Sequence, residues 1–189
     1  AQKAPWAWRV RNWLRFNFVF GWLANVAAKG FSALTGIPTI TAALHGRLIR
    51  ADGTVIDHGV LGYRVVTSAG VGFLVDDWDD DTTDITTMNY HASGTDNTAE
   101  NSSDTALGAE ATTVTDRATG TKSQPAANQL RSVATQAFTG TAAIVEHGLF
   151  SVVTESSGVL WDRTVFAAIN VGNGDSIEFT YTCTLNAGS

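Results

Sequence analysis

Apolar and polar residues alternate most regularly near the end of the chain. From residue 176 to 185 every second side chain is apolar, and most of those between are threonine. A period of two places successive side chains on opposite faces of a strand. The pattern predicts a half-buried strand whose inward-facing residues include Ile177, Phe179, Tyr181 and Leu185.

Other short runs rich in β-branched and aromatic residues predict further strands at 46–50, 55–67, 71–75, 86–92, 112–119, 129–139, 143–150 and 159–166. Asp52-Gly53 and Asn173-Gly174 predict tight turns, because glycine adopts positive φ without strain. Polar segments at 93–111 and 124–128 predict loops. Eight or nine short strands are typical of an all-β fold, here an antiparallel β-sandwich of the jelly-roll or immunoglobulin-like type.

The N-terminal segment differs from the rest in charge. Residues 1–29 contain five basic residues and no acidic one, whereas residues 30–189 contain seven basic and 18 acidic residues, a net charge of −11. The segment is also rich in tryptophan and phenylalanine. We therefore divide the chain into a basic aromatic arm with its linker, 1–45, and a body, 46–189.

The arm fits two local conformations. On a helix, Val10, Leu14, Phe18 and Trp22 form one line, whereas on a strand Phe16, Phe18, Phe20 and Trp22 share a face. A helix over 6–28, ending near Gly30, is the favoured interpretation.

Several roles for the arm remain open from the sequence. A secretory signal would have a basic start and a small-residue end, as at 26–28, but the run is unusually aromatic. A membrane span needs about 20 apolar residues, and 16–28 is shorter and contains Asn17 and Asn25. A helix on a membrane surface, a phosphate contact, and packing on the body or on another subunit are the other options. Packing is favoured, and the predicted partner contacts are Trp6, Trp8, Arg9, Arg11, Trp13, Arg15, Phe16, Phe18, Phe20 and Trp22.

Candidate chemistry in the body is sparse. The single cysteine, Cys183, lies in the apolar phase of its strand, which predicts a small buried side chain. The four histidines, His45, His58, His91 and His147, lack metal-ligand spacing. His58 and His147 each precede a glycine beside an apolar run, which predicts hydrogen bonds at strand ends. No nucleophile elbow or phosphate-binding loop is present, so we expect no catalytic site and no cofactor.

An acidic run is the one candidate for metal binding. It contains Asp76, Asp77, Asp79, Asp80, Asp81 and Asp84. Calcium takes six to eight oxygen ligands, so such a run could contribute several. Its spacing lacks the glycine and closing glutamate of an EF-hand loop, and a solvated acidic loop is the simpler interpretation. A third interpretation is that the acidic run contacts the basic arm of another copy of the chain.

Three segments resemble structural proteins of tailed-bacteriophage virions, often small capsid decoration (cement) or head-fibre proteins. They are EHGLFS at 146–151, LWDRTVFAAINV at 160–171 and NGDSIEFTYTCTLNAG at 173–188. The segments 59–78 and 117–144 also fit, whereas residues 1–45 lie outside the resemblance.

The resemblance implies a decoration protein on the capsid surface that binds the major capsid protein and stabilises the head. Such proteins sit at local symmetry axes, which implies a homodimer or homotrimer. It implies no nucleic-acid partner, and a membrane is not expected. A tail, collar or head-fibre protein that contacts the host is the alternative. A small glycan-active enzyme is a third class, although such domains are usually longer.

Overall fold

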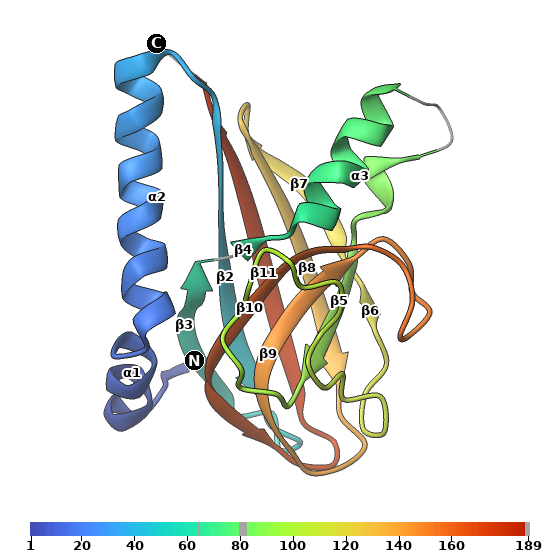
Figure 1. Cartoon of the computed structure of the whole chain (residues 1–189). Coiled ribbons are helices and arrows are strands. Elements are labelled where there is room, and N and C mark those ends of the chain that lie inside the picture. The colour runs from blue at the N-terminus through green and yellow to red at the C-terminus, as the bar shows by residue number, and fades with distance from the viewer. Residues whose placement is uncertain (64, 80–82, 188–189) are drawn as a thin grey trace.

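The computed structural model of the chain describes residues 1–63, 65–79 and 83–187. Two β-sheets form the body (Figure 1). The first contains, in spatial order, β1 (Gln2–Lys3), β3 (Val55–Tyr63), β2 (Thr39–Ile49), β11 (Ser176–Asn186), β8 (Gln129–Ala137) and β7 (Thr121–Ala126). The second contains β4 (Val65–Val66), β10 (Leu160–Val171), β9 (Ala142–Phe150), β5 (Tyr90–Gly94) and β6 (Ala118–Thr119). The prediction of a β-rich fold is confirmed at this level.

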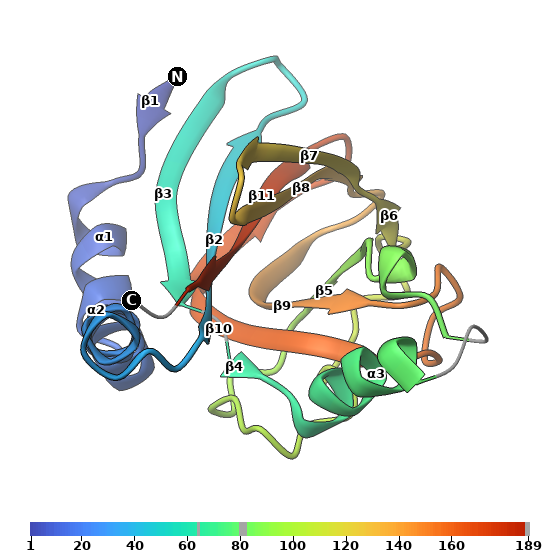
Figure 2. The same cartoon turned by 90° about the horizontal axis from the view of Figure 1, so that it is seen from above.

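The strand pairs are antiparallel, except that β1 runs parallel to β3 and makes the first sheet mixed. Helical segments lie outside the sheets: α1 (Trp6–Trp13), α2 (Phe16–Thr35), α3 (Ser68–Asp79) and the short 3-10 helix η1 (Ile85–Thr87). Viewed from above, α1 and α2 lie beside β3 and β2, and α3 lies by the second sheet (Figure 2).

The main hydrophobic core lies between the two sheets. Leu44 and Phe179 enter it from the first sheet and Ile144 and Phe166 from the second, and all four are fully buried. The alternation predicted for β11 is confirmed at Ile177, Phe179, Tyr181 and Cys183. Leu185 instead is 52% exposed, because it pairs with Ile40 at an end of the sheet beyond the core.

The predicted strand at 71–75 is wrong, since these residues belong to α3. A run of five apolar residues fits a buried strand or a helix turn equally well. The preceding Thr67 decides between them: its hydroxyl accepts a hydrogen bond from Gly70 N at 2.9 Å and caps the helix start. Gly70 also passes so close to Trp161 that a Cβ would lie 2.6 Å from the Trp161 carbonyl oxygen.

The bounds of several other predicted strands differ from those in the structure. The segment 55–67 is two strands, β3 in one sheet and β4 in the other, so the chain crosses between sheets here. Only Ala118–Thr119 is strand within the predicted 112–119, whereas 112–114 form a turn and 115–117 are irregular. β2 begins at Thr39, inside the segment expected to be linker. Both glycine turns are confirmed, with φ of 84° at Gly53 and Gly174.

Candidate partner-binding site on the N-terminal arm

Helix α1 attaches to the body at a place where the pairing of β10 with β9 is irregular. The pairing of β10 with β9 shifts register between Val165 and Ile169, so the backbone groups between them leave the regular ladder. The Trp8 indole Nε1 donates to the carbonyl oxygens of Ala167 at 3.1 Å and Ala168 at 2.9 Å. The arm therefore supplies these backbone carbonyls with hydrogen-bond donors that strand β9 does not supply.

Asn12 completes this attachment and reaches the other sheet. Its Oδ1 accepts from Ala167 N at 2.9 Å, and its Nδ2 donates to the Leu61 carbonyl of β3 at 2.8 Å. Trp8 is 5% and Asn12 2% exposed. One tryptophan and one asparagine thus bridge β10 and β3, and α1 is part of the folded body rather than a free extension.

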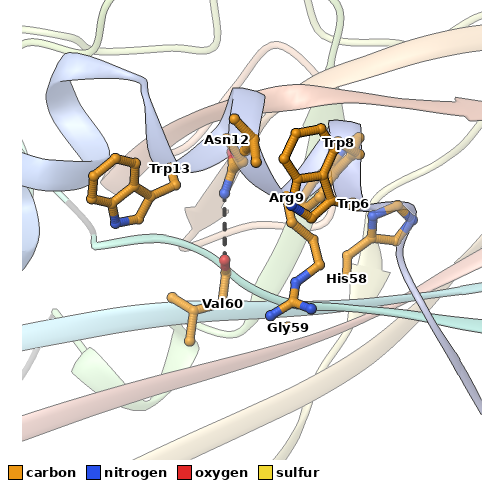
Figure 3. A pocket seen from close by; sticks show the side chains of 9 residues that line it. Trp6, Trp8, Arg9, Asn12, Trp13, His58, Gly59 and Val60 are labelled. Carbon is orange, nitrogen blue, oxygen red and sulfur yellow. Dashed lines mark hydrogen bonds between the residues drawn. The ribbon is translucent and has the colours of Figure 1, made fainter.

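Beside this attachment lies a pocket of about 430 Å³ between α1 and β3. In Figure 3, Trp6, Trp8 and His58 gather at one end, Trp13 stands at the other, and Arg9 extends toward Gly59. Trp6 is 78% and Trp13 59% exposed, so two indoles are available at the surface. Indole faces with a nearby guanidinium suit a peptide segment that carries apolar and acidic side chains.

His58 lies under α1, 8% exposed, with its ring 4.4 Å from that of Trp8 in an edge-to-face arrangement. Among the residues that the structure describes, neither ring nitrogen has a hydrogen-bond partner. Burial lowers the pKa of His58 from 6.5 to about 4, although the Asp57 carboxylate acts in the opposite direction. The imidazole is therefore neutral at pH 7, and protonating it opposes docking of α1. The predicted strand-end hydrogen bond is absent here, because His58 lies within β3 against the arm.

Replacing His58 by phenylalanine is expected to change the pH dependence of stability. In the natural protein, stability from the neutral ring is complete above pH 6.5 and is lost as pH falls toward 4. The variant lacks this loss, so its advantage in free energy of unfolding should grow by about 1–2 kcal/mol across that range, which is the effect of the pKa difference reduced for solvent screening. Urea unfolding of both proteins from pH 7 to 4 measures the difference. If the free energies of unfolding of the two proteins fall in parallel with pH, protonation of His58 does not destabilise the fold.

Helix α2 turns its small and polar side to the sheet. Gly21, Asn25, Ala28 and Ser32, spaced at helical intervals, are buried or half-buried. A Cβ on Gly21 would lie 2.9 Å from Tyr63 Cβ, so glycine allows the close approach to β3. The Ser32 hydroxyl lies 2.8 Å from that of Thr39. The helix therefore contacts its own body through residues that bury little apolar area.

The rest of the surface of α2 is largely apolar and exposed. Phe20, Trp22, Leu23, Val26, Phe31 and Leu34 are between 46% and 88% exposed. Amphipathic helices normally bury the apolar side, so the polarity of α2 is inverted. Among the described residues, no helix is long and apolar enough to cross a membrane.

The predicted partner contacts separate into different environments. Trp8 is buried against the body, and Arg15 donates to the Phe166 carbonyl at 3.3 Å. The side chains of Phe16 and Phe18 lie outside the described residues. The remaining residues are exposed, and they are Trp6, Arg9, Arg11, Trp13, Phe20 and Trp22.

The acidic run is divided between elements. Asp76, Asp77 and Asp79 lie in α3, and Asp80 and Asp81 lie outside the described residues. The Asp77 side chain accepts from Ile85 N at 2.9 Å, and Asp84 accepts from Thr86 N at 2.7 Å and caps η1. Within the described part of the chain, no three acidic, histidine or cysteine side chains group as a metal site.

The fold also brings together polar residues that the sequence keeps far apart. The rings of His91 and His147 approach to 3.0 Å between Nδ1 and Nε2, and His91 Nε2 lies 2.8 Å from the Ser132 hydroxyl. His147 lies mid-strand in β9, so its predicted strand-end position is wrong. All three are at most 1% exposed. A hydroxyl beside an imidazole resembles a nucleophile and its base, but substrate cannot reach it without opening the sheets.

Glu146 and Arg163 form a buried ion pair at 2.7 Å between β9 and β10. Glu146 also accepts from Gly108 N at 3.0 Å and Ala109 N at 2.9 Å, and Arg163 contacts Asp104 at 3.0 Å. The pair therefore fixes the long polar segment after β5 onto the second sheet. Cys183 is also buried, which raises the pKa of its thiol to about 11, as expected for a packing residue.

Comparison with models of protein families, with curated proteins and with solved structures returned no match.

Proposed function

We propose that this chain is a structural protein of a tailed-bacteriophage virion, a capsid decoration protein that binds the major capsid protein. It sits on the capsid surface, acts without catalysis, and stabilises the head. We further propose that its two sheets form a sandwich of the jelly-roll or immunoglobulin-like type. The resemblance of residues 146–188 to such proteins motivates the assignment.

The observation that carries a binding role is the set of exposed aromatic residues on the arm. Trp6 and Trp13 flank a pocket of about 430 Å³ and remain 78% and 59% exposed. Tryptophan and arginine dominate the energetics of protein interfaces. Arg9 places positive charge beside the same indoles, which suits an acidic segment of a capsid protein. Many identical contacts on a lattice multiply a modest affinity by avidity.

Replacing Trp6 by alanine is expected to weaken binding to undecorated capsids at least tenfold, because an interface tryptophan is worth about 2 kcal/mol or more. Trp78 in α3 is the matched control: it is the same residue type with the same exposed fraction, 78%, on another part of the molecule. Co-sedimentation with capsids over a range of protein concentrations measures both variants. Equal losses for W6A and W78A, or no binding by the natural protein, would contradict the proposal.

A further inference from the structure

The exposed side of α2 contains an ordered stripe. Its residues follow one another at intervals of three, four, four and three, and we call them the outer stripe: Phe20, Leu23, Ala27, Phe31 and Leu34. Such intervals keep side chains on one line along a helix. All five are exposed, and the four large side chains range from 46% at Leu23 to 88% at Leu34. In Figure 1, α2 stands at the edge of the molecule with no other element on its outer side.

The outer stripe is large for a protein surface in contact with water. Its five residues expose roughly 450 Å² of apolar side chain, taking about 150–250 Å² for each complete aromatic. Trp22 and Val26 are not counted, because they line the groove beside Lys29. The largest apolar patch on a monomer is typically about 300–600 Å². A stable interface needs about 800 Å² from each partner. The stripe supplies more than half of that value, and Leu14, exposed just before the start of α2, adds to it.

The stripe is symmetric about Ala27. Counted from it, Leu23 and Phe31 stand four residues away on either side, and Phe20 and Leu34 seven. In an antiparallel pair of α2 helices that cross at Ala27, Phe20 would meet Leu34 of the second copy and Leu23 would meet Phe31. A two-fold interface requires this reciprocity. The small residue at the crossing allows the helices to approach closely.

We propose that two copies of this chain associate through the outer stripe, with their α2 helices antiparallel and crossing at Ala27. Antiparallel pairing separates the two basic α1 segments by most of the length of α2, about 30 Å for 20 residues. It also aligns the helix dipoles favourably. Lys29, the one charged residue of α2, lines a groove between the helix and the first sheet rather than the stripe.

Cysteine cross-linking tests the position and the direction of the pair. Ala27→Cys places two thiols at the crossing, and most of the protein is expected to form a disulfide-linked dimer under mild oxidation. The natural Cys183 is buried and does not compete. Leu23→Cys cross-links only in a parallel pair, and Ala33→Cys lies off the stripe, so both should remain monomeric on a denaturing gel. Efficient cross-linking of Leu23→Cys would overturn the antiparallel arrangement.

Analytical ultracentrifugation tests the association itself. The natural protein should sediment at twice the chain mass of 20.0 kDa, and Ala27→Glu should weaken the dimer at least tenfold because it buries an unpaired charge. Val75→Glu, at a position 52% exposed on α3, is the control that should leave the dimer intact. A natural protein that is monomeric at micromolar concentrations would overturn the proposal.

Flotation with vesicles of phosphatidylcholine and phosphatidylglycerol separates this proposal from a membrane contact. The dimer should not bind the vesicles, since its stripe is covered. A monomer that binds vesicles, and loses that binding in Ala27→Glu, would assign the stripe to a lipid surface instead. Capsid co-sedimentation of Ala27→Glu reports on capsid attachment separately, because the stripe lies outside the Trp6 pocket.

Discussion

Replacing Glu146 by alanine is expected to lower the free energy of unfolding by about 3–5 kcal/mol, as for removal of one partner of a buried ion pair. Arg163, 3% exposed, would retain its charge without its closest carboxylate. The amides of Gly108 and Ala109 would lose their acceptor at the same time. Urea unfolding measures the loss, and hydrogen exchange should show segment 95–111 opening first.

The Arg47–Glu178 pair is the matched control. Its charged atoms are also close, at 2.8 Å, but the side chains are 40% and 26% exposed. Exposed pairs contribute about 0.2–1 kcal/mol, so Glu178→Ala should cost little. Adding Arg163→Met to Glu146→Ala should recover part of the loss, because the second change removes a buried charge that has kept only its more exposed partners, Asp104 and Asp96. A small effect of Glu146→Ala alone would show that the segment is held by other contacts.

Replacing Trp8 by alanine is expected to cost about 3–5 kcal/mol, the usual range for a buried tryptophan. The change removes a side chain from the main core and both hydrogen bonds to β10. Because Trp8 and Asn12 carry the attachment of α1, the arm should detach before the sheets unfold. Trypsin should then cut at Arg9, Arg11 and Arg15 in buffer without denaturant, and mass spectrometry of the fragments identifies these sites.

Trp6→Ala controls for the loss of an indole from the arm. At 78% exposure its effect on stability should stay within about 0.5 kcal/mol, and the arm should stay resistant to trypsin. If W8A is as resistant and as stable as W6A, the arm is held mainly by contacts other than Trp8.

The sequence predicts those elements in which one face is apolar and the other is polar. β11 is an example: apolar residues alternate with threonine, and both the strand and its buried face are confirmed from Ile177 to Cys183. The run at 71–75 has no such contrast, and its helix depends on a threonine cap and on a close passage of Gly70 past Trp161. These are tertiary contacts, which local pattern does not contain.

The arrangement of the candidate site could be predicted only in part. Aromatic enrichment identifies the arm, but which residues are buried depends on backbone groups in β10, some 160 residues away. His91, Ser132 and His147 carry no spacing signal because separate strands bring them together. The inverted polarity of α2 did leave a signal that could have been used, the small residues Gly21, Asn25, Ala28 and Ser32 along one helical line.

The register shift in β10 also affects the order in which parts of the chain fold during translation. The arm is translated well before β10, because the carbonyls that receive Trp8 lie 159 and 160 residues further along the chain. At about 5–20 residues per second, the ribosome completes β10 roughly 10–30 s after the arm has formed. During that interval the aromatic residues of α1 cannot pack on the body, because β10 has not yet been synthesised. Long-range closure of this kind slows folding, so we expect α1 to dock late although it is synthesised long before its acceptors.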